Sequence, residues 1–409
     1  MDKIFNTIHS CRLCDSKHII EMLNLTDQPP ANSLYKSNNE KPQDVPLRLM
    51  FCKDCSAVQL GESVDPAYLF NQYVWVTGTS STAIAYSIDF ANNAISRCQS
   101  ENPKVVEIAS NDGTFLKRFL DLGCEVLGVD PAKNIAQIAT DNNIPTIAKF
   151  FTTEVASEIV EESGHKDIVI ARNVLPHVKE IHSVVKGISA LLKEDTGLGV
   201  IEFHDAGLIW KELHYDSIYH EHLFLFSLKT MSQFLKEHGL HVFDIMPSPI
   251  SGGSWVIYFS KIEKPKSKKL LSVENDEKDS GLNTAAAWDD FSKKSIAHAE
   301  KLKELIFAEE GKILAYGASA RSSTLLNFCG IDSQKISAII DKNPLKHDLF
   351  TPGSDIPVIS YEEGLKRIVD TKKILLLAWN FQDEIVRDLR ESGFEGEFIV
   401  PLPNEPHIV

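Results

Sequence analysis

Apolar and polar positions alternate in the middle of the chain as they do in successive strands, turns and helices. Val105–Ile108 is an apolar run with one acid, and it leads into the polar turn Ala109–Gly113. Thr114–Leu120 then places apolar residues at helical spacing. A second apolar run, Cys124–Asp130, ends in an acid. This order of strand, tight turn, helix and strand predicts the opening of a nucleotide-cofactor fold.

The same alternation continues to about residue 260. Asp167–Asn173 and Gly199–His204 are short apolar runs typical of buried parallel strands. Leu240–Ile245 and Trp255–Ser260 predict an antiparallel pair that closes the sheet. The middle of the chain is therefore expected to form one doubly wound αβ domain.

A second lobe follows a charged stretch with few apolar residues, 264–283. A helical pattern runs from about 285 to 309, and Lys312–Arg321 repeats the order of strand, turn and helix. Ile336–Asp341 and Lys373–Trp379 predict further strands. We expect a second Rossmann-like domain for a ligand of nucleotide character, with a degenerate lobe that only packs as the alternative.

Composition narrows the class of protein. The 409 residues are 43% hydrophobic and 24% charged, which is ordinary for a globular protein of two or three domains. The formal net charge of -15 disfavours nonspecific binding to nucleic acid or to an anionic membrane surface. No stretch approaches the roughly 18 apolar residues of a membrane span. We expect a cytoplasmic protein with no nucleic-acid or membrane partner, and a monomer slightly in preference to an oligomer.

Four of the seven cysteines form two Cys-x-x-Cys pairs, Cys11 with Cys14 and Cys52 with Cys55. Two such pairs complete a tetrahedral shell of four thiolates, which suits a structural zinc ion. The odd cysteine count argues against a disulfide framework. A redox pair or unrelated surface cysteines are the alternatives.

The first turn favours S-adenosylmethionine over a dinucleotide. A dinucleotide needs a glycine-rich cradle for its pyrophosphate, whereas here only Gly113 is glycine, and S-adenosylmethionine has no pyrophosphate. Asp130, after the second strand, is expected to accept both ribose hydroxyls. An αβ unit without a ligand is the alternative. The expected cofactor-binding residues are Glu107, Ala109, Asn111, Gly113, Asp130 and Asn173.

A tyrosine, two histidines and a glutamate crowd together in Asp216–His222. On a helix, Tyr219 and His222 would share a face, and Glu221 could orient a histidine or contact the substrate. Acid/base chemistry is the favoured interpretation. The alternatives are purely structural residues or a metal site, although no third ligand follows at a typical distance.

Two further places carry expected site residues. His177 and His204 come just after predicted strands, at the edge where ligand crevices form in parallel sheets. Tyr73–Thr82 is too polar for a core strand and too aromatic for a linker. We expect a lid or substrate loop there, with a packed loop as the alternative.

Short motifs in all three parts of the chain point to one known family. They are Gln28–Ser33, Glu107–Gly113, Gly128–Pro131, Asn173–His177, Asp216–His222, Tyr316–Ala318, Asp341–Pro344 and Thr351–Gly353. Together they resemble the nucleotide-sugar C-methyltransferases of deoxysugar biosynthesis. The expected fold class is α/β, with a zinc-binding module at 1–70, a class I methyltransferase domain at 71–264 and a Rossmann-like nucleotide-sugar-binding domain at 284–409.

The resemblance implies a reaction. A base removes a proton from the carbon next to a 4-keto group on a nucleotide-linked sugar, and the enolate takes the methyl group of S-adenosylmethionine. By the motif match, His222 is the expected base, with Tyr219 and Glu221 beside it. His177 is expected to support the enolate oxygen, and donors there would stabilise it. The expected residues for the nucleotide-diphosphate sugar are Trp75, Gly317, Ser319, Arg321 and Asp341, with Arg321 as a phosphate partner.

The chain departs from the family where substrate would be held. Ser251 stands where a histidine often precedes Gly-Gly-Ser, Trp75 where a second tyrosine is frequent, and Arg321-Ser322 where Lys-Gly is usual. These departures leave the sugar and the methylated carbon open. The alternatives are transfer to oxygen or nitrogen, with His222 deprotonating a hydroxyl or amine, and an inactive zinc-bearing binding protein.

Overall fold

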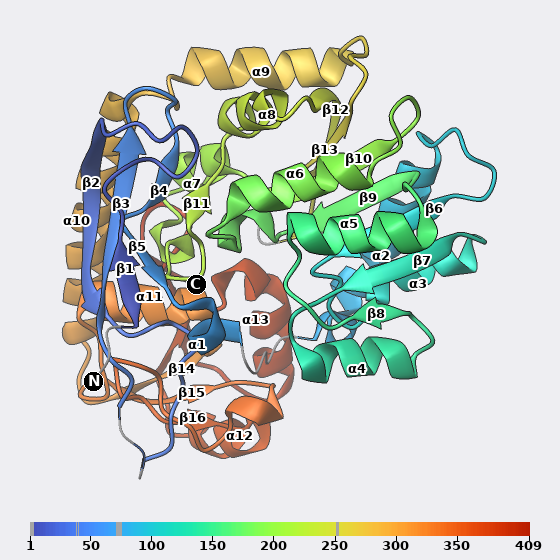
Figure 1. The fold of residues 1–409 in the computed structure, drawn as a ribbon. Coiled ribbons are helices and arrows are strands. Elements are labelled where there is room, and N and C mark those ends of the chain that lie inside the picture. Colours follow the sequence, from blue (N-terminus) through green and yellow to red (C-terminus); the bar gives the residue numbers. More distant parts are fainter. Residues whose placement is uncertain (1–3, 38, 40, 71–75, 251–252) are drawn as a thin grey trace.

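Four sheets organise the residues that the structure describes, which are 4–37, 39, 41–70, 76–250 and 253–409. The structure is a computed structural model, and Figure 1 shows its two large sheets with the amino-terminal strands packed beside them. Trp75 and Ser251, where the sequence departs from its family, fall outside the described residues.

A seven-stranded sheet forms the middle domain, in the order β12-β13-β10-β9-β6-β7-β8. Neighbouring strands from β10 to β8 are parallel, and β13 runs antiparallel to both β10 and β12. The predicted αβ domain with an antiparallel closing pair is therefore confirmed. The strands are β6 (Lys104–Ile108), β7 (Glu125–Val129), β8 (Thr146–Ile147), β9 (Ile168–Arg172), β10 (Leu198–His204), β12 (His241–Ser248) and β13 (Ser254–Ser260).

Helices cover both faces of this sheet because its strands are apolar on both sides. Val105 and Ile168 pack in one core cluster, and their neighbours Val106 and Val169 pack in another, as the two-residue period of a strand requires. Helices α2 and α3 pack together, as do α5 and α6. The helices are α2 (Ser81–Ile95), α3 (Thr114–Asp121), α4 (Lys133–Asp141), α5 (Thr153–Ser163), α6 (Ile181–Leu191), α7 (Ala206–Lys211) and α8 (Leu228–Glu237).

The carboxyl-terminal sheet has the order β16-β15-β14-β17-β18-β19, with only the β18–β19 pair antiparallel. This is the strand order of a Rossmann-like lobe, as predicted. Its strands are β14 (Ile313–Tyr316), β15 (Ile336–Ile340), β16 (Val358–Ile359), β17 (Lys373–Leu376), β18 (Glu397–Val400) and β19 (His407–Ile408), and its helices are α10 (Ala285–Phe307), α11 (Ala320–Cys329), α12 (Tyr361–Ile368) and α13 (Gln382–Glu391).

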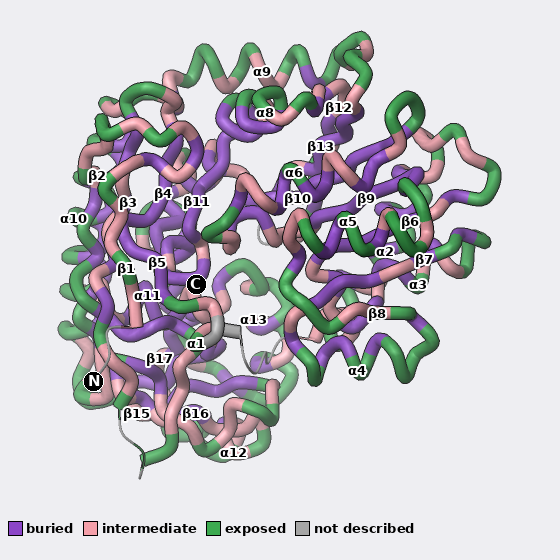
Figure 2. The backbone as a smooth tube through the Cα atoms, viewed as in Figure 1, coloured by how far each residue is buried: buried purple, intermediate pink, exposed green. Residues whose placement is uncertain are grey.

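The charged stretch between the two large domains is a helix, α9 (Lys268–Ser280). Ser267 caps its first turn, and Gly281 ends it in the left-handed conformation that glycine tolerates best. Leu270 is its one buried residue, so α9 lies on the outside of the molecule, as Figure 2 shows. No helix in the described ranges is long and apolar enough to cross a membrane.

The amino-terminal sheet includes a strand from much later in the chain. Its order is β11-β4-β3-β2, and β11 pairs antiparallel with β4 although it follows the Asp216–His222 segment in sequence. The expected boundary at residue 70 therefore does not separate two independent sheets. The elements of this part are β1 (Phe5–Thr7), β2 (Ile19–Gln28), β3 (Val45–Cys52), β4 (Val58–Leu60), β5 (Glu62–Val64), α1 (Pro66–Phe70) and β11 (Phe224–Leu225).

Candidate functional site

The turn between β6 and α3 holds its backbone in a conformation that side chains disfavour. Ala109 has a φ of 54°, Asn111 of 52° and Gly113 of 77°, and Asn173, after β9, has a φ of 49°. Left-handed backbone at residues other than glycine is uncommon, and it concentrates at functional sites. Four of the predicted cofactor residues therefore share one strained edge of the sheet.

Asp130 holds this turn in place from the neighbouring strand. Its Oδ2 accepts a hydrogen bond from the backbone N–H of Asn111, and its Oδ1 accepts one from Ala132, both at 2.9 Å. Burial raises the pKa of Asp130, and these two hydrogen bonds offset part of that increase. The carboxylate is thus fixed at the mouth of the turn, and its contact with a ribose stays a prediction.

Glu107 brings a buried carboxyl group beneath the same turn. Its Oε1 lies 3.6 Å from Nη1 of Arg172, but the Nε of Arg172 donates to Glu202 at 2.8 Å. Oε2 of Glu107 has no hydrogen-bond partner among the described residues, and burial raises the pKa of Glu107 to about 8. One cation therefore serves two buried carboxylates. A cationic ligand fits this surplus of acid, and S-adenosylmethionine carries such a charge on its sulfur.

The loop predicted as a lid is tied to the cofactor turn. Its described part contains a short 3₁₀ helix, η1 (Thr77–Thr79). The backbone N–H of Thr77 donates to Asn111 Oδ1, and that of Gly78 donates to Asp112 Oδ2, both at 2.8 Å. A Cβ on Gly78 would lie 2.6 Å from that carboxylate oxygen. The contacts of Gly78 and Asp112 were not predicted from the sequence. Gly78 lies in the loop predicted as a lid, and Asp112 lies in the turn predicted to bind the cofactor.

Replacing Asp130 by asparagine is expected to weaken S-adenosylmethionine binding roughly tenfold to a hundredfold. The amide removes the charge that accepts hydrogen bonds from the turn and, as predicted, from the ribose. Calorimetric titration with S-adenosylmethionine measures the effect. Asp141→Asn is the matched control, since Asp141 is exposed at the end of α4 and should leave affinity unchanged. Equal affinities for both variants would remove Asp130 from the cofactor site.

Tyr219 and His222 lie in a turn and not on a helix, so the prediction that they share the face of a helix is wrong. The backbone N–H of His222 donates to the Tyr219 carbonyl at 2.8 Å, three residues back. A turn of this span also brings the two side chains together. The Tyr219 hydroxyl lies 2.7 Å from Nε2 of His222. The predicted pairing of these side chains is present for a different backbone reason.

Hydrogen bonding determines which nitrogen of His222 carries the proton. Nδ1 lies 2.8 Å from the Ser217 carbonyl, which can only accept, so Nδ1 donates. Burial holds the pKa of His222 well below its usual value, so the ring is neutral and Nε2 keeps its lone pair. The Tyr219 hydroxyl therefore donates to Nε2. His222 presents a base of defined tautomer on a ring that is still partly accessible.

His177 lies next to the Tyr219–His222 pair and comes from a different segment of the chain. It ends a short 3₁₀ helix after β9, η2 (Leu175–His177), and its ring centroid lies 4.8 Å from that of His222. Burial lowers the pKa of His177 to about 4, and a hydrogen bond to the Glu221 backbone opposes that change. His204 is also buried and neutral, but it stacks on His214. The structure therefore brings His177 to the Tyr219–His222 pair.

The carboxyl-terminal lobe contacts the Asp216–His222 segment through Arg321. Asp216 begins that segment in η3 (Tyr215–Ser217), and Arg321 donates to both of its carboxylate oxygens, at 3.0 and 2.8 Å. Trp379, in η6 (Trp379–Phe381), donates its indole N–H to Asp216 at 2.9 Å and lies under the guanidinium. Arg321 is thus already paired. A contact with phosphate, as predicted, would use its remaining N–H groups.

The other residues expected to hold a nucleotide line the start of α11. Gly317 has a φ of 95°, and Asp341 Oδ2 accepts the backbone N–H of Ala318 at 2.8 Å. The Ser319 hydroxyl caps the helix by accepting the N–H of Ser322. This repeats the arrangement at Asp130, where an acid from the second strand braces the first turn. Whether a nucleotide binds here stays a prediction.

Asp216→Asn is expected to lower the stability of the protein by about 3 kcal/mol, because it removes the buried carboxylate that pairs with the partly buried Arg321 cation. Thermal or denaturant unfolding measures the loss. The matched control is Asp289→Asn, which breaks an exposed pair with Lys293 one helical turn away and should cost less than about 1 kcal/mol. Equal losses of unfolding free energy in the two variants would show that the Asp216–Arg321 contact does not hold the domains together.

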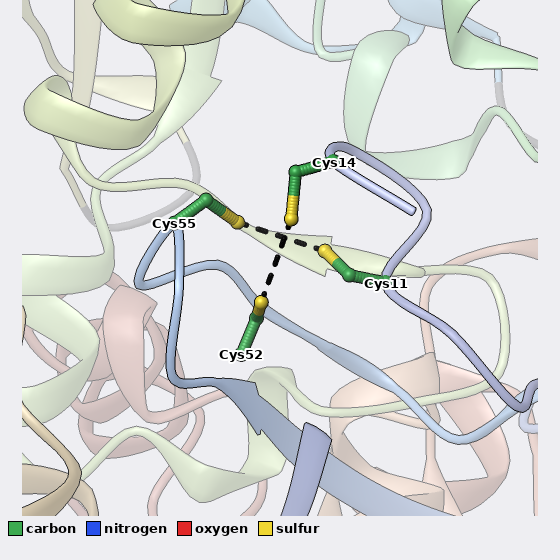
Figure 3. A group of neighbouring side chains, drawn as sticks. All are labelled: Cys11, Cys14, Cys52 and Cys55. Atoms are coloured by element: carbon green, nitrogen blue, oxygen red, sulfur yellow. Dashed lines mark hydrogen bonds between the residues drawn. The ribbon is translucent and has the colours of Figure 1, made fainter. Parts of the chain in front are cut away.

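Four thiols of the amino-terminal module converge on one point, as Figure 3 shows. The Sγ atoms of Cys11, Cys14, Cys52 and Cys55 all lie within 4.8 Å of one another, and two of the pairs are 3.6 Å apart. The side-chain amide of Gln59 donates to the Cys11 sulfur at 3.1 Å, as second ligand shells commonly do. Four sulfurs at these distances fit a tetrahedral zinc ion, and the predicted convergence of the four thiols is present.

Family models match all three parts of the chain. Residues 11–70 match a putative zinc binding domain, 85–245 a methyltransferase domain, and 249–403 a C-methyltransferase C-terminal domain. Two solved structures match just under half of the chain with low identity. A S-adenosylmethionine-dependent methyltransferase from Clostridium acetobutylicum is 11% identical, with a TM-score of 0.36, over 46% of this chain and 94% of its own. Magnesium protoporphyrin IX methyltransferase from Synechocystis is 11% identical, with a TM-score of 0.32, over 43% and 76%.

Curated relatives agree with these models. The chain is 31% identical to the C-methyltransferase NovU of Streptomyces niveus, over all of this chain and 99% of that protein. A ubiquinone biosynthesis O-methyltransferase of Rhodopseudomonas palustris is 30% identical over 113 residues, which is 27% of this chain and 44% of that protein. The full-length match extends through the zinc module and both large domains. The chain therefore belongs to the C-methyltransferase family and is an S-adenosylmethionine-dependent methyltransferase with a zinc-binding amino-terminal module.

Proposed function

We propose that this enzyme methylates the carbon next to the 4-keto group of a nucleotide-linked deoxysugar. The observation that carries the proposal is the neutral His222 ring, whose Nδ1 proton is fixed on the Ser217 carbonyl and whose Nε2 lone pair is directed to a hydroxyl. A general base for a carbon acid next to a ketone has to be unprotonated and within reach of the acceptor, and the neutral His222 ring meets the first condition. The full-length relative is itself a C-methyltransferase.

The residues have separate parts in the proposed reaction. Nε2 of His222 takes the proton once the acceptor displaces the Tyr219 hydroxyl from it, and the electron pair of the C–H bond forms the enolate. His177 lies next to His222 as a neutral ring whose one N–H is directed to the Glu221 backbone, so we place it in the wall of the acceptor pocket beside the base. S-adenosylmethionine, held at the turn after β6, would supply the electrophilic methyl group, with S-adenosylhomocysteine as the second product. The enolate carbon forms the new C–C bond as the bond from sulfur to methyl breaks.

The second Rossmann-like lobe is proposed to hold the nucleotide diphosphate. Support comes from Gly317, whose left-handed backbone opens the turn at the start of α11, and from Asp341, which braces it. Arg321 would add a cation beside this turn. The lobe and the methyl-transfer residues meet at Asp216, so a sugar joined to a nucleotide could reach from one to the other.

Mass spectrometry in heavy water tests the proposal with S-adenosylmethionine and a panel of 4-keto nucleotide sugars. A stable methyl-sized mass gain, with deuterium exchange at the same carbon when the cofactor is left out, is expected. Methylation that mild ether or ester cleavage removes would instead establish an oxygen acceptor. Neither methylation nor exchange, with cofactor binding confirmed, would overturn the sugar proposal in favour of another hydroxyl or amine substrate.

A further inference from the structure

The amino-terminal module reaches into the methyl-transfer site through Asn32. The Asn32 side-chain amide donates to Oε1 of Glu221 at 2.5 Å, across 189 positions of the sequence. Glu221 directly precedes His222, and its backbone also binds the His177 ring. A residue between the two zinc-binding pairs therefore contacts the segment that carries the proposed base.

Three further contacts fix the position of this amide. The backbone carbonyl of Ala31, next to Asn32, accepts a hydrogen bond from the buried Ser323 hydroxyl at 3.0 Å. His220 Nε2 donates to the Val45 carbonyl of β3 at 3.1 Å. β11, which follows His222 directly, adds itself to the zinc module's sheet. The Asn32–Glu221 bond thus spans a built interface between the module, the catalytic segment and α11.

Burial differs sharply across the bond. Glu221 is 4% exposed, whereas the Asn32 side chain is exposed to solvent. No second hydrogen bond joins the Asn32 side chain to other described residues. Its amide oxygen and second N–H therefore have no partner among the described residues. A sugar, which is rich in hydroxyl groups, matches both of these groups.

Asn32 also stabilises one charge state of Glu221. Burial raises the pKa of Glu221 to about 7, and the Asn32 N–H opposes the increase because it stabilises the carboxylate. The titratable groups around it are Tyr219, His220 and His222 on its own segment and His177 on η2. Burial lowers the pKa of all three histidines, to about 4 for His177 and His220, so they stay neutral. Arg321, on α11, is paired with Asp216.

We infer that Asn32 is a positioning residue of the methyl-acceptor site: from the zinc module, it holds the Glu221 carboxyl group beside His222, where this group accepts a hydroxyl of the acceptor. The inference rests on the proposed function of the catalytic segment. It gives the zinc module a part in substrate recognition besides its structural one. Glu221 acts in the ionised form, so activity falls as pH falls through the pKa of Glu221.

The pH profile of kcat/KM tests the inference. The wild-type profile is expected to fall below about pH 7, whereas that of Asn32→Ala falls below about pH 8, because losing one hydrogen bond to a carboxylate shifts its protonation equilibrium about tenfold. The variant should be about fivefold slower than wild type at pH 7 and should recover at pH 9. Asn32→Asp, which places a second carboxylate beside Glu221, should shift the profile further in the same direction.

Asn24→Ala is the matched control. Asn24 is an exposed asparagine of β2 whose side chain accepts the Thr26 N–H within its own strand, so this variant should keep the wild-type profile. Zinc content and melting temperature should match wild type in all three variants. A slow Asn32→Ala enzyme with an unshifted pH profile would overturn the inference, because general damage does not recover at high pH.

An infrared titration separates this inference from the proposed function. The protonated carboxyl band of Glu221, assigned by its loss in Glu221→Gln, can be followed without any acceptor. A higher titration midpoint in Asn32→Ala supports the inference even if the 4-keto sugars prove not to be substrates. The same midpoint in Asn32→Ala and wild type overturns it whatever the substrate is.

Discussion

His222→Ala is expected to reduce turnover roughly a hundredfold to ten-thousandfold and to leave S-adenosylmethionine affinity unchanged. The reason is the tautomer that the Ser217 carbonyl fixes, which makes Nε2 the one basic atom of this ring. The cofactor turn lies at the ends of β6 and β7, on different segments from His222. Turnover and calorimetric affinity, measured on one preparation, separate the two effects.

The same variant should also lose deuterium exchange at the acceptor carbon, since proton removal precedes methyl transfer. His165→Ala is the matched control. His165 is exposed in the same domain, and its ring binds the Ala190 carbonyl and none of the residues around His222. Exchange at the wild-type rate in His222→Ala would assign the base to another residue. Loss of cofactor affinity together with turnover would mean that the variant damages the cofactor turn.

Cys52→Ser is expected to release the zinc ion, lower the melting temperature by roughly 10 °C or more, and reduce turnover at least a hundredfold. Structural zinc contributes folding free energy that a small module cannot obtain from its core. The catalytic effect follows from β11 and Asn32, because both join the module to the segment around His222. Zinc analysis, thermal melting and turnover provide the three measurements.

Cys98→Ser is the control for the thiol change. Cys98 is a free cysteine outside the four-sulfur cluster, so zinc content and turnover should stay at wild-type values. Full zinc content and wild-type melting in Cys52→Ser would contradict a four-thiolate site. Zinc loss with full turnover would instead show that the module does not support the catalytic segment.

Local patterns predicted the parts of the site that depend on neighbouring residues. The apolar run at Val105–Ile108 and the polar turn after it predict a strand and a turn, because each depends on positions a few residues apart. Each Cys-x-x-Cys pair is also a local pattern, and the repeat of the motif predicts that both pairs share one metal although Cys14 and Cys52 are 38 positions apart. Tyr219 and His222 were correctly paired on spacing alone, although the backbone between them is a turn.

Contacts between distant segments leave no such pattern. Asn32 is one asparagine in a polar loop, and nothing near it in sequence indicates Glu221. Asp216 was noticed within its motif, but its bidentate bond with Arg321 joins residues 105 positions apart. β11 is two residues long, too short for any alternation to reveal its partner. These contacts follow from how the domains pack, which periodicity does not encode.

The pairing of β11 with β4 has a consequence for synthesis of the protein. The ribosome makes Leu60 long before Leu225, and at ordinary elongation rates the interval is roughly ten to thirty seconds. During that time β4 presents an open strand edge, which can recruit other nascent chains. Zinc binding by the cysteines can order the module early. Its sheet is complete only when β11 has left the ribosomal exit tunnel, after most of the methyltransferase domain. Slow translation between these strands should therefore favour aggregation, and a zinc-depleted medium should worsen it.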